Sequence, residues 1–197
     1  MSDKETLNVY AEKAADYAAM TDEFNTRDPS LDAFIAAIPQ GGCVLDLGCG
    51  PGASAAQMAA AGLTVDAFDP VPEMVAMAAR HAGVNARQAG FDDLHAEAIY
   101  DGVWANFSLL HAPREDMPRH LAQIKSALKP GGQFHIAVKT GTGSERDSLG
   151  RFYTYYTETE LMGLMEQAGF TVMDRREGRD KGLSGDVSPW VALAAHG

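Results

Sequence analysis

Residues 44–54, VLDLGCGPGAS, combine an apolar run, a carboxylate and a glycine-rich turn. Asp46 lies near the end of the run, and Gly48 and Gly50 follow it. Glycines at such a turn let the backbone approach a ligand, and a following helix offers free backbone N–H groups. Gly48, Gly50 and Ala53 also satisfy the G-x-G-x-x-G/A spacing of dinucleotide-binding turns. The segment therefore predicts a cofactor site where a strand gives way to a helix.

The carboxylate of Asp46 indicates which class of cofactor fits. A pyrophosphate at the mouth of the turn would be repelled by this side chain, whereas an ammonium or sulfonium group would be attracted. S-adenosylmethionine carries both cations, together with a carboxylate and a ribose. A second carboxylate, Asp69, follows 23 positions later, near the offset of about 20 at which an acidic residue meets ribose hydroxyls in such folds. The pair favours S-adenosylmethionine over a dinucleotide.

The spacing of apolar residues predicts the elements that must position these carboxylates. Strand–helix alternation indicates an α/β fold with a doubly wound, mostly parallel sheet of seven strands. The last two strands are joined by a short, turn-rich segment without room for a crossover helix, so the last strand is predicted to be antiparallel. Predicted strands cover residues 43–47, 63–68, 84–88, 102–107, 133–139, 170–176 and 189–195. Predicted helices cover residues 1–20, 31–38, 53–61, 73–80, 118–128 and 157–169.

Composition narrows the class of protein and its partners. A length of 197 residues suggests one domain, residues 1–197, and the net charge is −11. Because no Lys/Arg-rich block occurs, neither a nucleic acid nor a membrane surface is an expected partner. An extended chain between Cys43 and Cys49 is too long for a disulfide, which favours a reducing, cytoplasmic location. No apolar signal region or membrane-spanning run is found.

Five motifs together resemble a known family. VLDLGCGPG, FDP, GFDDL, ANFSLLH and LKPGGQF occur in the order and spacing of class I S-adenosylmethionine-dependent methyltransferases, over roughly residues 40–175. Within that class the chain is similar to bacterial small-molecule methyltransferases of the tellurite-resistance and quinone-biosynthesis type. The resemblance implies a Rossmann-like methyltransferase fold and, over residues 1–38, an N-terminal helical lid.

The resemblance also implies roles for individual residues. The third motif departs from the family, because Ala89-Gly90-Phe91 stands where many relatives have Gly-Asp-Ala. Asp92 is therefore expected to take over the contact to the adenine amino group, although a surface helix cap is the alternative. The expected cofactor-binding residues are Asp46, Gly48 and Gly50 at the methionine part, Asp69 at the ribose, Pro70, Phe91 and Asp92 at the adenine, Asn106 and Phe107 near the methyl group, and Tyr17 in the lid.

His111, near the end of the fourth predicted strand, is the candidate catalytic base. Histidine titrates near neutrality, but a lone histidine beside apolar residues is often a structural group. Tyr10 and Tyr17 are predicted on one helical face, either as core residues or as the inner face of the lid. The histidines lack metal-ligand spacing, so no metal site is predicted.

Residues 140–156 form a long, polar, aromatic connection, and long ordered loops are often functional. Arg146, Arg151 and Tyr153 are predicted to contact the methyl acceptor there. A solvated loop with an internal pair between Asp147 and Arg151 is the competing interpretation.

The function that these features favour is transfer of a methyl group from S-adenosylmethionine to a small-molecule acceptor, with S-adenosylhomocysteine as the product. A non-catalytic module that senses S-adenosylmethionine is the alternative from another class. A nucleotide-dependent oxidoreductase is a further alternative, which the negative charge of Asp46 disfavours. A thiol acceptor would ionise with little help, whereas a hydroxyl or carbon acid would need a base. The acceptor and the oligomeric state stay open.

Overall fold

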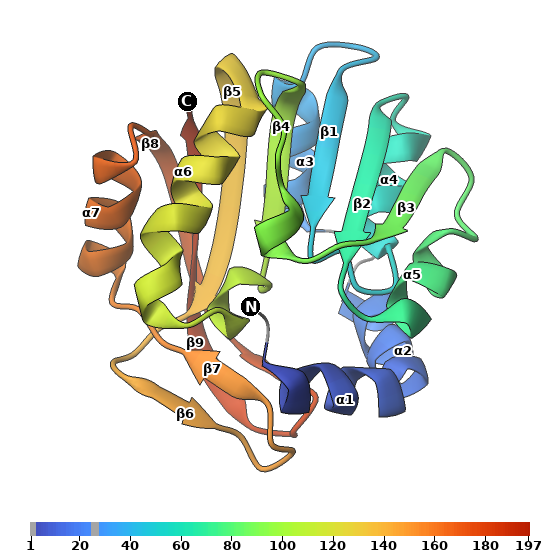
Figure 1. Ribbon diagram of the computed structural model, residues 1–197, viewed down its shortest axis with the longest axis vertical. Helices are drawn as coiled ribbons and strands as arrows, with labels where there is room; N and C mark the ends of the chain where they lie inside the picture. Colours follow the sequence, from blue (N-terminus) through green and yellow to red (C-terminus); the bar gives the residue numbers. More distant parts are fainter. Residues whose placement is uncertain (1–2, 25–27) are drawn as a thin grey trace.

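The computed structural model describes residues 3–24 and 28–197. Its centre is a seven-stranded sheet in the order β3-β2-β1-β4-β5-β9-β8, in which β9 runs antiparallel to both of its neighbours (Figure 1). The sheet confirms the predicted α/β fold with an antiparallel last strand. The sheet strands are β1 Cys43–Leu47, β2 Thr64–Asp69, β3 Val84–Gln88, β4 Tyr100–Asn106, β5 Leu128–Lys139, β8 Thr171–Lys181 and β9 Val187–His196.

Helices cover both faces of this sheet. Four of the five residues of β1 are buried, as expected for a central strand with helices on each side. One core lies between the sheet and α3 and α4, around Phe34, Met58 and Trp104. The other lies under α6 and α7, around Ile124 and Leu161. The helices are α1 Lys4–Glu12, α2 Ala14–Phe24, α3 Pro29–Ala37, α4 Ala53–Ala60, α5 Pro72–Ala78, α6 Met117–Ala127 and α7 Glu158–Gln167.

The carboxyl ends of β1, β2, β4 and β5 meet at one edge of the sheet, where ligands bind in open α/β folds. Because β9 is antiparallel, its first residues lie at this same edge beside the end of β8. Figure 1 shows α1 crossing below this edge, next to the small hairpin of β6 and β7. The hairpin strands are β6 Ser144–Arg146 and β7 Phe152–Thr154.

The structure corrects the prediction of one helix over the first twenty residues. The chain instead forms α1 and α2, with the break at Lys13, whose N–H donates to Val9 O at 3.0 Å. Tyr10 and Tyr17 thus lie on two helices rather than on one face. Their rings still pack edge to face, with centroids 5.2 Å apart.

Two further segments are more regular than predicted. The connection over residues 140–156 contains the β6–β7 hairpin, whose three-residue strands are too short to give a periodic pattern. The turn-rich residues 177–188 are mostly strand, since β8 and β9 pair from Thr171 to Lys181. β8 is largely exposed, so it lacks the apolar alternation that would have predicted its length.

Other local predictions are confirmed. The hydroxyl of Thr157 caps α7 by accepting from Glu160 N at 3.2 Å, as its capping-box spacing indicated. Pro118 occupies the first turn of α6, and Cys43 and Cys49 are free thiols. Within residues 3–24 and 28–197, none of the helices has the length and apolar character needed to cross a bilayer.

Candidate cofactor and acceptor site

The turn after β1 is shaped by close backbone packing. Gly48 N and Cys49 N both donate to Phe68 O, at 2.8 and 2.9 Å. Gly48 has φ +81° and Gly50 has φ +54°, a backbone region that favours glycine. A Cβ atom on Gly48 would lie 2.3 Å from the Cβ of Ser108. Gly48 therefore brings the backbone against the segment that follows β4, and Gly50 lies against the Tyr17 ring.

Asp46 is buried beside this turn with one oxygen unsatisfied. Its side chain is 3% exposed, and Oδ2 has no hydrogen-bond partner among the described residues. Burial and the nearby charge of Asp69 raise the pKa of Asp46 to about 7, partly offset by the backbone N–H of Ala55. A buried carboxylate oxygen without a partner is costly unless a ligand satisfies it. An ammonium group fits this requirement, and a pyrophosphate does not.

Asp69, at the end of β2, holds the neighbouring backbone. It accepts from Gly50 N through Oδ2 and from Val71 N through Oδ1, both at 2.9 Å. Burial raises the pKa of Asp69 to about 6, against the lowering effect of these two hydrogen bonds. Each carboxylate oxygen can accept a second hydrogen bond, which leaves acceptor capacity for ribose hydroxyls.

The residues predicted at the adenine separate into two groups. Pro70 and Phe91 line a small cavity next to Asp69, of about 60 Å³. Asp92 lines neither this cavity nor the larger one described below, and its carboxylate forms an ion pair with Arg119. Its predicted adenine contact stays a prediction.

Phe107 follows β4 and stands between the small cavity and a larger one of about 430 Å³, lining both together with Asn106. Phe107 has φ +53°, which is strained for a residue with a side chain and costs roughly 1–3 kcal/mol. Its N–H donates to Ala137 O at 3.0 Å, which fixes this conformation. Tyr10 and Tyr17 also line both cavities, so α1 and α2 cover them from the same side.

His111 lines both cavities but has both ring nitrogens engaged. Nδ1 lies 2.6 Å from Phe152 O, and a carbonyl can only accept, so Nδ1 carries the proton. Nε2 lies 2.9 Å from the hydroxyl of Tyr10, from which it accepts. The side chain is 9% exposed, and burial lowers the pKa of His111 to about 4. The ring is therefore neutral at pH 7 and tethers α1 to β7.

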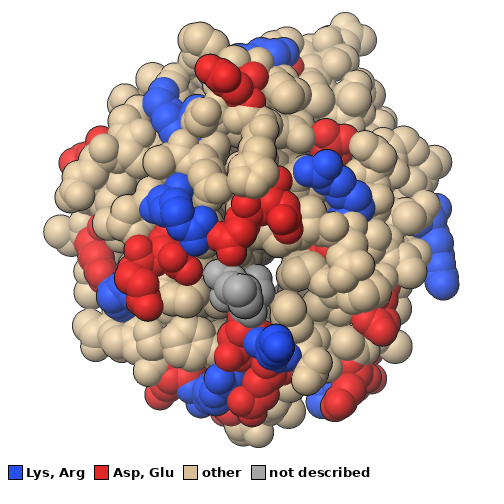
Figure 2. Space-filling view, in the orientation of Figure 1, with Lys and Arg blue, Asp and Glu red and all other residues tan. Residues whose placement is uncertain are grey.

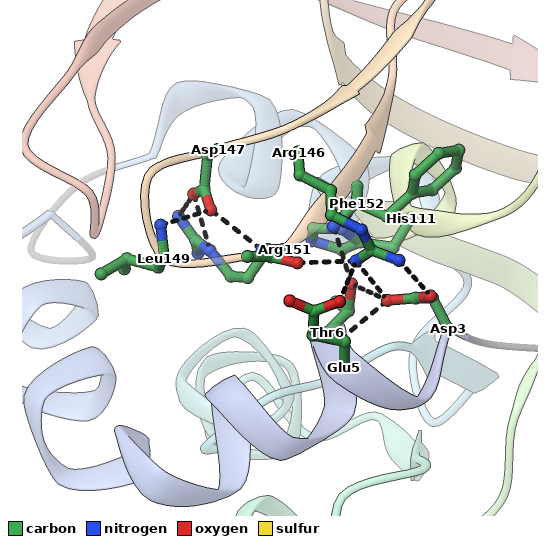
Figure 3. Close-up of polar contacts among 10 residues, drawn as sticks. Asp3, Glu5, Thr6, His111, Arg146, Asp147, Leu149, Arg151 and Phe152 are labelled. Atoms are coloured by element: carbon green, nitrogen blue, oxygen red, sulfur yellow. Dashed lines mark hydrogen bonds and ion pairs between the residues drawn. The ribbon is translucent and has the colours of Figure 1, made fainter.

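The three residues predicted to contact the acceptor lie on the β6–β7 hairpin, and Figure 3 shows two of them, Arg146 and Arg151, with their polar contacts. Arg151 is 2% exposed, donates to Asp147 Oδ2 through Nε and Nη2 at 3.0 and 2.7 Å, and reaches the Tyr10 hydroxyl through Nη1 at 3.0 Å. Arg146 lines neither cavity and pairs with Asp3, the N-cap residue of α1. Arg151 and Tyr153 line the larger cavity. Their contact with an acceptor stays a prediction, and the internal pair with Asp147 is present.

The sequence matches the family model of a methyltransferase domain over residues 19–174, which is most of the chain. The chain belongs to this family. The resemblance to class I S-adenosylmethionine-dependent methyltransferases is thereby confirmed, and S-adenosylmethionine is the cofactor.

Individual relatives of this methyltransferase agree with that assignment. The ubiquinone biosynthesis O-methyltransferases of Methylobacterium nodulans and Xanthomonas axonopodis are 29% and 35% identical, over 66% and 53% of this chain. The chain spans 60% and 46% of their lengths. A crystal structure of Burkholderia thailandensis 1,6-didemethyltoxoflavin-N1-methyltransferase, with bound 1,6-didemethyltoxoflavin and S-adenosylhomocysteine, is 26% identical. The structural alignment covers 96% of this chain and 87% of the chain in that crystal structure, with a TM-score of 0.72.

The methyltransferase site includes residues that sequence reasoning missed. Lys139 at the end of β5, Arg176 on β8 and Trp190 at the start of β9 line the far part of the larger cavity. The rule that ligands bind at the carboxyl ends of parallel strands could have found Lys139. Trp190 and Arg176 enter the site because β9 and β8 pair beyond β5, a register that no local pattern specifies.

The outer surface of the methyltransferase shows acidic and basic side chains interspersed on the face seen in Figure 2. No continuous basic area is present among the described residues of this face. The mixture of charges on this face is consistent with a net charge of −11.

Proposed function

We propose that this methyltransferase transfers the methyl group of S-adenosylmethionine to a small molecule bound in the larger cavity. The observation that carries the proposal is the unsatisfied Oδ2 of Asp46 beside the glycine turn, opening into a cavity that extends well beyond it. Bound S-adenosylmethionine supplies a methyl group on a sulfonium, which is already an activated leaving group.

The chain's own residues then have binding and orienting tasks. Asp46 pairs with the ammonium group, and Asp69 accepts from the ribose hydroxyls while it holds Gly50. Phe107 and Asn106 separate the cofactor from the acceptor and set the direction of approach, an orientation effect with large possible rate gains. Tyr10 and Tyr17 cover the site and exclude water, which is the role of the proposed lid over residues 1–38.

A cytoplasmic location is part of the proposal and is supported by the free thiols of Cys43 and Cys49. A bacterial source is supported by the bacterial relatives above.

Two measurements test the proposal against its alternatives. Calorimetry should detect saturable binding of S-adenosylmethionine and S-adenosylhomocysteine and none of NAD. With methyl-labelled S-adenosylmethionine and a cell extract, the label should appear in a small molecule other than S-adenosylmethionine, and only when this protein is added. Tight NAD binding would favour the oxidoreductase, whereas S-adenosylmethionine binding with no label transferred would favour the sensing module.

The tether role proposed for His111 makes a prediction about pH. Between about pH 6.5 and pH 4, His111 binds a proton in the unfolded chain but not in the folded one, where its pKa is about 4. The free energy of unfolding therefore decreases as the pH falls through this range. His111→Gln should reduce this acid-dependent loss by up to about 1.4 kcal/mol per pH unit within that window. Denaturant unfolding of both proteins at several pH values measures the difference.

Once an acceptor has been identified, the turnover of a His111 variant distinguishes a structural tether from a general base. A tether predicts that His111→Gln lowers kcat by less than about tenfold, whereas loss of a general base costs about a hundredfold or more. A hundredfold loss in a variant with unchanged stability would contradict the tether.

A further inference from the structure

The far part of the larger cavity has a floor set by strand register. Ala137 of β5 faces Ala192 of β9, which faces Arg176 of β8, so one row across the sheet holds two small side chains. Two positions further along, Lys139 faces Trp190, which faces Gly178. Residues opposite each other in antiparallel strands share a face, so both rows point into the cavity.

Gly178 determines where the indole of Trp190 lies. A Cβ atom at Gly178 would be 2.5 Å from the indole ring, so the ring lies over the glycine, away from Lys139. Trp190 Nε1 donates to Asp180 Oδ2 at 2.6 Å, which holds the ring there. On its other side the ring meets Phe107 edge to face, with centroids 6.0 Å apart. The result is a slot with an alanine floor and aromatic walls.

Lys139 supplies the charge of this slot. Its Nζ lies 4.0 Å from the centroid of the Tyr153 ring and forms no ion pair with a described carboxylate. Asp180 accepts a hydrogen bond from Trp190, and Arg151 forms an ion pair with Asp147. Arg176, which lines the cavity beside Ala192, is paired with Asp174 at 3.7 Å. Lys139 is thus the half-buried cation left beside the alanine floor.

We propose that the methyl acceptor is a planar aromatic molecule with an anionic group, whose ring lies in the slot against Trp190 and Phe107 and whose anion pairs with Lys139. The inference rests on the proposed function, because it assigns the substrate class of the same cavity. A flat ring fits the small floor, and a lysine without a carboxylate partner is best satisfied by an anion.

The test uses two matched pairs of probes: benzoate with benzamide, and 2-naphthoate with 2-naphthamide. Each is titrated by calorimetry into the full chain saturated with S-adenosylhomocysteine. The carboxylate of at least one pair should bind about 10- to 100-fold more tightly than its amide, as expected for a charge-assisted contact. Lys139→Met should remove this preference and leave the amide's affinity unchanged.

Two variants separate charge from ring contact. Trp190→Leu should weaken carboxylate and amide equally. Lys125→Met is the matched control, because Lys125 is a half-buried lysine on α6 with its Nζ 5.8 Å from the Phe170 ring, and it should change neither probe's affinity.

Equal affinity for carboxylate and amide, no binding of either pair at millimolar concentration, or the same effect from Lys125→Met would overturn the inference. Each of these results counts when S-adenosylhomocysteine still binds. Failure of S-adenosylhomocysteine itself to bind the wild-type chain would instead overturn the proposed function.

Discussion

Asp46→Asn should weaken binding of S-adenosylhomocysteine by about 10- to 100-fold, because the amide cannot form the charge-assisted contact to the ligand's ammonium group. The same substitution should raise the free energy of unfolding of the unliganded chain at pH 8 by about 1–4 kcal/mol. The substitution weakens ligand binding but stabilises the unliganded fold. The reason for the second effect is that the folded chain keeps a proton on Asp46 up to about pH 7, whereas the unfolded chain releases it near pH 3.8. Ionisation of this buried group therefore costs stability as pH rises between the two values.

The pH dependence of binding follows from the same pKa. Below about pH 7 most folded molecules carry a neutral Asp46, and the ligand must displace that proton. Affinity in the wild type should fall by up to about tenfold per pH unit below 7, and proton release should be visible as a buffer-dependent heat of binding. In Asp46→Asn the dependence should be much weaker.

Asp66→Asn is the control for this experiment. Asp66 lies on β2 with Asp69 but accepts from Tyr100 and Asn85 instead of lining either cavity. Its substitution should leave the affinity for S-adenosylhomocysteine within about threefold. An Asp46→Asn protein that binds with unchanged affinity and pH dependence would rule out the role assigned to this carboxylate.

Arg151→Met should lower the free energy of unfolding by about 3–5 kcal/mol, the cost of leaving one partner of a buried ion pair without the other. Asp147 would keep two backbone donors, Leu149 N and Arg151 N at 3.0 Å, but lose both guanidinium contacts. Urea unfolding at pH 7.5 measures the change.

The same hairpin provides a matched comparison. Arg146 is 41% exposed, and its pair with Asp3 is worth about 0–1 kcal/mol at such exposure, so Arg146→Met should cost no more than that. The double variant Asp147→Leu with Arg151→Met should recover part of the loss, because neither charge is then left alone. If Arg151→Met is as stable as the wild type and instead raises the acceptor KM, the sequence prediction of an acceptor contact holds.

The cofactor half of the site could be predicted from the sequence because it is built from local patterns. A strand, a glycine turn and a helix follow each other within residues 44–54, and Asp69 ends the next strand ahead of another helix. The carboxyl ends of adjacent parallel strands must meet, so the two carboxylates converge without any long-range information.

The acceptor half could not be predicted in the same way. Lys139 and Trp190 are 51 positions apart and face each other through the register of β5 and β9 alone. The internal pair of Asp147 with Arg151 was one of two interpretations that the sequence left open, and the structure contains that pair. The break at Lys13 lies within an apolar spacing that continues across it, so that spacing predicted one helix where the structure has two.

The contacts between α1 and the β6–β7 hairpin join segments about 140 positions apart: Asp3 to Arg146, Thr6 to Phe152 and Tyr10 to Arg151. During synthesis α1 leaves the ribosome first, but its partners leave it only after β5 is complete. Contacts of such long sequence separation form late in folding, because the intervening chain must be ordered before they can close. The central sheet strands β1 to β5 all lie within that intervening chain. We therefore expect the contacts between the N-terminal helix and the hairpin to close only after strands β1 to β5 have formed.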